Sequence, residues 1–83
     1  MITENTSLDE LFTQACAAAD TIVLSEETFI VKDLFRGVEW ARIPRGLRTK
    51  LGSMFFAHVR NAASNLYEPI GKTAQNQQIY KKY

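Results

Sequence analysis

Residues 28–31 constrain the fold more than any other part of the chain. This Thr-Phe-Ile-Val run is aromatic and β-branched, which favours a strand, but it is too short to stand alone. The other β-compatible runs are residues 66–72 and 77–83, and the polar residues 73–76 between them predict a hairpin loop. Pro69 predicts that the first of these runs is an edge strand or is bent. We therefore expect one small sheet that joins distant parts of the chain.

Two amphipathic helices are predicted on either side of that short strand. Ser7 and Glu10 have the spacing of a capping box, and apolar residues then recur at intervals of three and four up to about Leu24. The second helix begins at Pro44, because proline is tolerated at the first helical position. Its apolar stripe continues to about Ala63, so this is the longer helix.

The remaining segments complete the expected order of elements. Residues 32–36 predict a short helix that Gly37 stops, residues 38–43 a turn or a second short helix, and residues 1–6 a fraying end. The order is helix, short strand, short helix, long helix and β-hairpin. That is the order of a winged helix-turn-helix, an α+β fold, and residues 1–83 suffice for one such domain.

The small size also limits the chemistry. A chain of 83 residues buries too little surface to enclose a deep catalytic cleft. No nucleophile, base and orienting group can be assembled, and no side chains have metal-ligand spacing, so we expect no enzyme, no cofactor and no metal. Cys16, the single cysteine, is predicted to be a packed small side chain. His58 is predicted to be a core residue. Without a signal peptide or a long apolar run, we expect a cytoplasmic protein that does not contact a membrane.

The formal net charge of +1 conceals a segregation of charge along the chain. Residues 1–31 carry six acids and no Lys or Arg, whereas residues 42–83 carry eight bases and the single acid Glu68. This asymmetry favours a polyanion or an acidic partner for the basic half. The alternative is that the two halves attract each other within the fold. If the acidic half repels the ligand, a chain beginning near Thr28 should bind DNA more tightly, provided that it stays folded.

Candidate binding residues follow from the faces of the long helix and from the hairpin. On the helix, Phe56 falls on the basic face, which suits stacking against a base, although coverage of Phe56 as ordinary core is an equal alternative. The hairpin mixes cations, amides and aromatics, as nucleic-acid-binding wings and solvated β-edges both do. The predicted nucleic-acid contacts are Arg42, Arg45, Arg48, Lys50, Phe56, Arg60, Lys72, Gln77, Tyr80, Lys81 and Lys82, with Tyr83 as a further stacking candidate.

Two segments resemble a known family. They are residues 29–55, which include the run Val-Lys-Asp-Leu-Phe and the pair Glu39-Trp40, and residues 70–80, which include Gly-Lys-Thr. Both are similar to the small family, once catalogued as a domain of unknown function, that includes the single-stranded-DNA-binding protein of staphylococcal cassette chromosome elements. The resemblance implies a winged helix that binds single-stranded DNA in mobile-element replication or transfer. It also implies an apolar pocket, for which the candidates by position are Phe35, Trp40 and Phe55.

Three functions are consistent with these observations. The first is a non-enzymatic protein that binds single-stranded DNA in mobile-element or phage DNA metabolism. The second is a protein-interaction module of a mobile element or phage that docks on a host or element-encoded partner, with Trp40 and Phe56 as anchors. The third is a duplex-binding transcriptional regulator that acts as a homodimer, although the long helix offers few Asn or Gln side chains for reading adenine.

Overall fold

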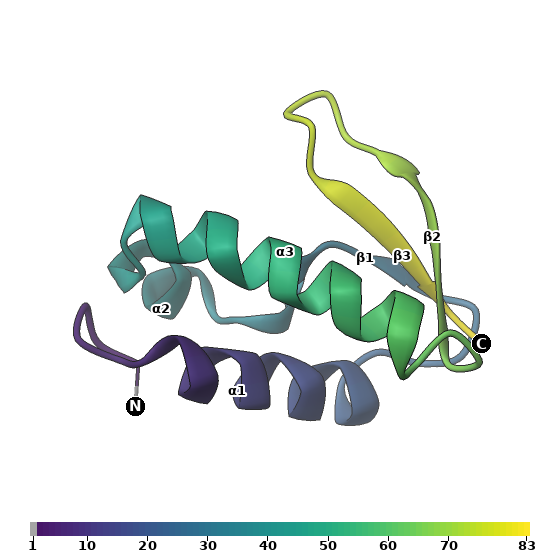
Figure 1. Cartoon of the computed structure of the whole chain (residues 1–83), viewed down its shortest axis with the longest axis horizontal. Coiled ribbons are helices and arrows are strands. Elements are labelled where there is room, and N and C mark those ends of the chain that lie inside the picture. Colours follow the sequence, from purple (N-terminus) through teal and green to yellow (C-terminus); the bar gives the residue numbers. More distant parts are fainter. Residues whose placement is uncertain (1) are drawn as a thin grey trace.

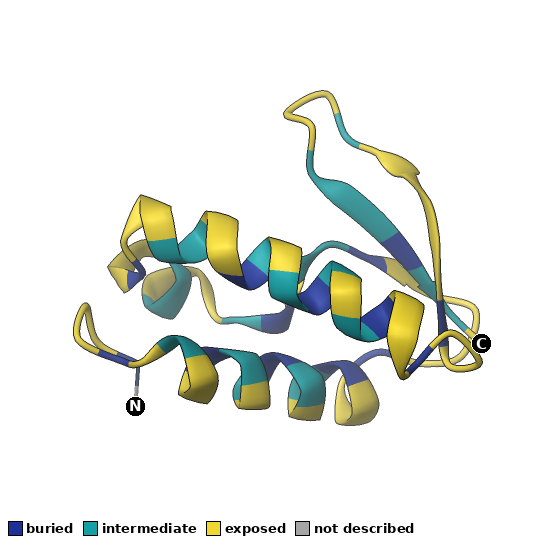
Figure 2. Cartoon of the chain, in the orientation of Figure 1, coloured by how far each residue is buried: buried dark blue, intermediate teal, exposed yellow. Residues whose placement is uncertain are grey.

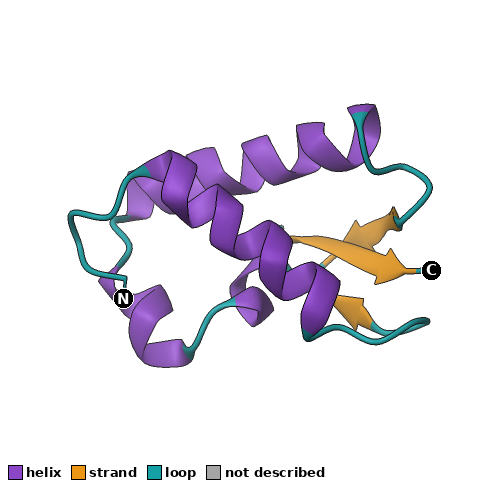
Figure 3. Ribbon diagram, turned by 90° about the horizontal axis from the view of Figure 1, so that it is seen from below, coloured by secondary structure: helices purple, strands orange, loops and turns teal. Residues whose placement is uncertain are grey.

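The computed structural model describes residues 2–83 and shows an α+β arrangement of three α-helices, a short 3-10 helix and a three-stranded antiparallel sheet (Figure 1). The sheet lies at one end of the helical layer and α2 lies at the other end (Figure 3). In chain order the elements are α1 (Leu8–Thr21), β1 (Thr28–Phe29), η1 (Val31–Leu34), α2 (Gly37–Arg42), α3 (Arg45–Asn61), β2 (Tyr67–Lys72) and β3 (Gln78–Lys82).

The short strand β1 pairs with the C-terminal hairpin, as its length requires. Strand β3 is central, with β1 on one side and β2 on the other, and Phe29 pairs with Tyr80 across the first ladder. This confirms the predicted sheet. Strand β2 is an edge, and its register shifts between Pro69 and Gly71, so Ile70 forms a bulge. Both parts of the prediction from Pro69 are confirmed.

Helix α1 begins as expected, because the Ser7 hydroxyl accepts a hydrogen bond from the Glu10 backbone N–H at 3.2 Å. It ends at Thr21 rather than near Leu24. The physical reason is that the Lys82 ammonium donates to carbonyls of the last turn and of the following loop, which lets the chain leave the helix. As a consequence, Ile22 and Leu24 are each 66% exposed instead of continuing the apolar stripe.

The segment between α1 and α3 also differs in detail from the prediction. A 3-10 helix over Val31–Leu34 replaces the short helix over 32–36, and the Asp33 carboxylate accepts the Ile30 N–H at 3.0 Å to hold it. The prediction that Gly37 stops this helix is wrong, because η1 ends at Leu34 and Gly37 is the first residue of α2. Helix α3 agrees closely with the prediction, with Pro44 in the N-cap position.

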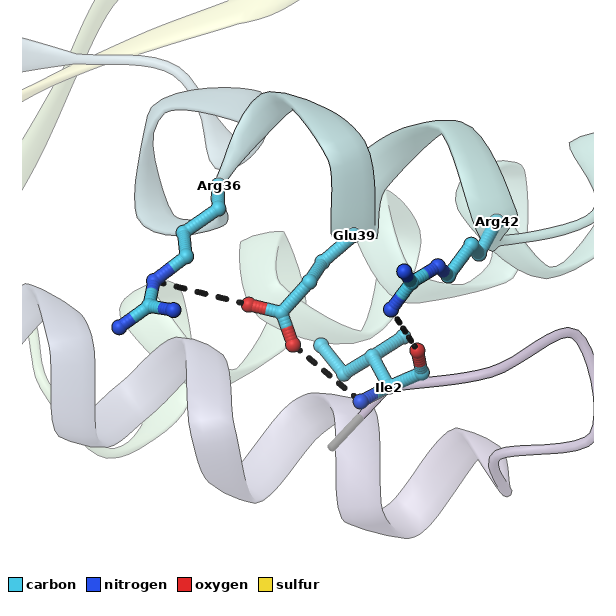
Figure 4. A network of polar contacts seen from close by, with 4 residues as sticks. All are labelled: Ile2, Arg36, Glu39 and Arg42. Carbon is cyan, nitrogen blue, oxygen red and sulfur yellow. Dashed lines mark hydrogen bonds and ion pairs between the residues drawn. The ribbon is translucent and has the colours of Figure 1, made fainter.

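The sequence predicted that residues 1–6 fray, but residues 2–6 are held against the fold. Ile2 is 1% exposed and packs against the core beside Leu11, Ile43 and Leu51. Its backbone N–H donates to the Glu39 carboxylate at 3.2 Å, and its carbonyl accepts from Arg42 at 3.0 Å (Figure 4). Apolar burial and these two hydrogen bonds outweigh the entropy of a free end. Met1 lies outside the described residues.

The core is shared by the facing sides of α1 and α3, the sheet and the connecting segments (Figure 2). Helix α1 contributes Leu11, Ala15 and Ala19, which are fully or almost fully buried. A chain that began near Thr28 would lose this whole layer and leave the buried face of α3 in water, which costs far more than a small domain can lose. We therefore do not expect such a truncated chain to fold, and the role of the acids has to be tested by point substitution.

Candidate nucleic-acid interface

A groove with a volume of about 730 Å³ runs between α3 and the β2–β3 hairpin. The hairpin projects beyond α3 on the side opposite α1 (Figure 1), and residues 30–32 contribute the connecting wall. We call this feature the wing groove. It is lined by Ile30, Val31, Lys32, Trp40, Arg45, Arg48, Thr49, Gly52, Ser53, Phe56, Lys72, Gln75, Asn76, Gln77, Gln78 and Tyr80.

The wing groove carries a single sign of charge. Four of its lining residues, Lys32, Arg45, Arg48 and Lys72, are cationic, and none of the residues that line it is acidic. A concave surface of one charge concentrates its field and attracts the opposite charge from solution. The segregation seen along the sequence thus becomes a segregation in space, because the acids of α1 lie on the other side of α3 (Figure 1).

Two acids close to the basic half, Glu26 and Glu39, are engaged within the fold. Glu26 lies 2.9 Å from the ammonium of Lys81, which is on the central strand β3. Glu39 accepts from the Ile2 backbone and lies 4.0 Å from Arg36 (Figure 4). Neither carboxylate lines the wing groove, so neither competes there with an anionic ligand.

Three aromatic side chains line the groove, and two of them, Phe56 and Trp40, have an arginine over the ring. Phe56 is half-buried and packs against the main core, while the Arg60 guanidinium carbon lies 5.6 Å from its ring centroid. Trp40 is half-buried at the other end, with the Arg48 guanidinium carbon 5.3 Å from its ring. Phe56 therefore packs against the core and also lines the groove, so its position is compatible with both of the roles that the sequence left open.

Arg48 is held in place by the backbone around the α2–α3 junction. Its Nε donates to the Ile43 carbonyl at 2.9 Å, and a terminal nitrogen donates to the Ala41 carbonyl at 3.4 Å. These bonds fix the guanidinium against Trp40, so the pair forms a preorganised corner of the groove. Arg45 and Lys72 are exposed and have no such restraint from residues 2–83, so their charges face solvent.

Several predicted cations have structural partners instead. The Lys82 ammonium donates to the carbonyls of Ala19, Asp20 and Val23 at 2.9, 2.9 and 2.8 Å. Lys81 pairs with Glu26, which with Glu68 raises the pKa of the lysine, and Arg42 donates to the Ile2 carbonyl. None of these three cations lines the wing groove, and neither do the exposed Lys50 and Arg60.

The aromatic predictions need correction at two residues. Tyr80 has no exposed surface, because its position on the central strand β3 places its ring against Phe29 and Phe55, so it cannot stack on a base. Phe55 is also fully buried, since it lies on the α3 face that packs against the sheet, and it does not join Trp40 in the groove. Phe35 contacts Trp40, with ring centroids 5.6 Å apart, from the core side. Tyr83 is exposed, but its backbone pairs with Leu66 at the base of the hairpin, outside the groove.

Lys32 is the groove cation that sequence reasoning missed. Its charge falls in the segment 32–41, where bases and acids cancel, and nothing local shows that η1 lies beside the hairpin. Gln77, which was predicted, lines the groove together with the loop residues Gln75 and Asn76. Asn76 adopts a φ of 65°, a left-handed conformation that Asn tolerates and that turns the loop.

A second, smaller hollow of about 320 Å³ lies between α1 and the start of β2. It is lined in part by Cys16, His58 and Tyr67. Cys16 is half-buried, and burial raises the pKa of its thiol, so it is a poor nucleophile. The His58 ring packs edge-on to Phe12 at 5.3 Å, as a residue at the border of the core.

Within residues 2–83, no His, Cys, Asp or Glu side chains cluster in a way that would hold a metal ion. No helix in the same range has the length and apolar character needed to cross a membrane.

The comparisons with known proteins identify a family and nothing more specific. No curated protein and no solved structure matches the chain significantly. A family model described as "Domain of unknown function (DUF1413)" matches residues 13–82, which is most of the chain, and the protein therefore belongs to that family.

Proposed function

We propose that this protein is a non-enzymatic winged helix that binds single-stranded DNA in the wing groove. In this proposal α2 and α3 form the helix-turn-helix and the β2–β3 hairpin is the wing. The observation that carries it is the composition of the groove, in which cations, amides and the half-buried rings of Trp40 and Phe56 occur without any acid. Proteins that bind single strands combine a positive groove for the backbone with aromatic surfaces for the bases.

The position of the hairpin favours a single strand over a duplex. A duplex-binding winged helix places its recognition helix in the major groove, which requires an open outer face on that helix. Here the residues of α3 that would enter the major groove, such as Thr49, Ser53 and Phe56, face the hairpin loop across the wing groove. In this proposal a single strand enters the groove, which has a volume of about 730 Å³.

The resemblance to the single-stranded-DNA-binding family of staphylococcal cassette chromosome elements supports the same conclusion. The residues that carry it include Trp40 in the groove wall and Lys72 at its rim. We propose that the protein acts in mobile-element or phage DNA metabolism in the cytoplasm.

Titration of labelled oligonucleotides tests the proposal. Fluorescence anisotropy should show that a 20-nucleotide single strand binds more tightly than the matching duplex. The affinity for the single strand should fall steeply between low and moderate salt. No binding to either at low salt would refute the proposal. Preference for the duplex would favour the regulator, and capture of a protein partner that survives nuclease treatment would favour the interaction module.

Substitutions of Phe56 test whether single-stranded DNA binds in the wing groove. Phe56→Leu keeps an apolar contact with the core and removes the ring, so it is the matched control for Phe56→Ala. If the ring stacks on a base, both variants should bind at least about 5-fold more weakly while circular dichroism shows an unchanged fold. If only Phe56→Ala is affected, and it is also destabilised, then Phe56 acts through packing alone.

A further inference from the structure

Gln78 is the first residue of β3 and lines the wing groove from the hairpin. Side chains alternate between the two faces of a strand, so Gln78 lies on the same face as Tyr80. The Tyr80 ring meets Phe55 of α3 edge-on, with centroids 5.1 Å apart, so this face of the sheet looks toward α3. The Gln78 side chain therefore extends on the groove side of the hairpin.

Two hydrogen bonds to the backbone hold the Gln78 amide. Its Nε2 atom donates to the Gly71 carbonyl at 2.8 Å and to the Ile79 carbonyl at 3.1 Å. Carbonyl oxygens only accept hydrogen bonds, so the group that faces them is the amide nitrogen, and both of its N–H groups are engaged. What the side chain offers to a ligand is therefore the acceptor Oε1 alone.

The Oε1 atom of Gln78 is accessible. Gln78 is half-buried, and within residues 2–83 its Oε1 accepts no hydrogen bond. In the same range the Tyr80 hydroxyl is the single buried side-chain polar atom that lacks a partner. Oε1 therefore keeps exposed surface, and a ligand in the groove meets an acceptor that is already oriented.

We propose that Gln78 Oε1 is a specificity-determining acceptor of the wing groove, which takes a hydrogen bond from the exocyclic amine of cytosine. The phosphates and sugars within a DNA strand carry no hydrogen-bond donor, so only a base can use this acceptor. A glutamine with free donors and a free acceptor reads adenine, whereas an acceptor alone pairs with the amine of cytosine. The proposal rests on the proposed function, because it assigns a residue to the same groove.

The fixed orientation of the amide makes the acceptor selective. Uracil carries a carbonyl oxygen where cytosine carries the amine, and two oxygens that face each other have no proton to share. Gln78 cannot turn its donors toward that oxygen without giving up its bonds to Gly71 and Ile79. Gln75 differs, because it is exposed and its amide makes no hydrogen bond within residues 2–83, so it can turn either end toward a base.

The test compares oligo(dC) with oligo(dU) of equal length at neutral pH by fluorescence anisotropy. Both strands carry the same phosphates and rings of the same size. One hydrogen bond to the base should make the wild type bind oligo(dC) about 3- to 10-fold more tightly than oligo(dU). Gln78→Met keeps the length of the side chain and removes the acceptor, so the ratio of the two affinities should fall to about 1.

The matched control is Gln75→Met, which makes the same change at an unrestrained amide of the same groove and should keep the wild-type ratio. The ratio also separates recognition from folding, because a loosened hairpin would weaken the binding of both strands equally. If the wild type binds both strands equally, or if Gln78→Met keeps the wild-type ratio, the inference is wrong while the proposed function stands. If the wild type binds neither strand, the proposed function fails and the inference fails with it.

Discussion

The substitution Lys82→Met tests whether Lys82, a cation of the C-terminal half, stabilises the fold and does not bind the ligand. The Lys82 ammonium donates three hydrogen bonds, at 2.8 to 2.9 Å, to carbonyls at the end of α1 and in the loop that follows it. It also places a positive charge at the negative end of the helix dipole. Methionine keeps the aliphatic stem and removes only the charge and the donors.

The expected loss of stability is about 2 to 3 kcal/mol. A hydrogen bond that involves a charged group contributes roughly 1.5–3 kcal/mol net, and a cation at a helix C-terminus adds roughly 0.3–1 kcal/mol. We take the lower part of the combined range because Lys82 remains partly exposed and the three bonds share one donor. In a domain of this size the melting temperature should then fall by about 10–20 °C.

Urea unfolding followed by circular dichroism measures this loss, and the adjacent variant Lys81→Met is its control. Lys81 makes one ion pair with Glu26, whose side chain is 71% exposed, so its removal should change stability far less. At a temperature where Lys82→Met is folded, its affinity for single-stranded DNA should equal that of the wild type. A variant that is as stable as the wild type but binds DNA weakly would refute the structural role that we assign to Lys82.

Three further predictions test the core, the groove wall and the buried tyrosine. Ile2→Ala should destabilise the protein by roughly 2–4 kcal/mol in urea unfolding, because Ile2 is buried, and an unchanged midpoint would mean that the first residues do not pack as described. At Gly52 an added Cβ would meet open space, so Gly52→Ala should stabilise α3 by roughly 0.5–1 kcal/mol. Gly52 also lines the groove, so Gly52→Trp should fill the groove and abolish DNA binding without unfolding the chain. Burial raises the pKa of Tyr80 above its ordinary value of 10 to about 12, so the folded state binds the proton of this group more tightly than the unfolded state does. The contribution of Tyr80 to stability should therefore be constant below pH 10 and fall between pH 10 and 12 by up to about 1.4 kcal/mol per pH unit. The slope of stability against pH in this range should be smaller in Tyr80→Phe, and an equal slope would contradict the assignment.

The order of elements could be predicted because each is encoded locally. Ser7 caps α1, Pro44 precedes α3, and the shortness of 28–31 forces that strand onto the hairpin. The edge position of β2 also followed from one residue, Pro69. These signals are independent of the rest of the chain, so sequence alone carries them.

The candidate site was predicted less completely because side chains of one type have different roles at the two ends of the hairpin. Near its base, Lys82 meets the end of α1 and Tyr80 meets the core, whereas Lys72 near the loop lines the groove. The composition of the hairpin is similar throughout, and only the tertiary structure shows where the sheet leaves the body of the protein. Lys32 was missed for the same reason, since its place in the groove depends on how η1 packs.

The central claim is that the wing groove is where a single strand binds, and an NMR titration tests it most directly. The amide resonances of a ¹⁵N-labelled sample would be followed at low salt as oligo(dT) is added. The largest shifts should fall in residues 45–56 and 72–78, with α1 (Leu8–Thr21) almost unaffected. Shifts centred on α1, or a spectrum that does not change at a large excess of the strand, would contradict it.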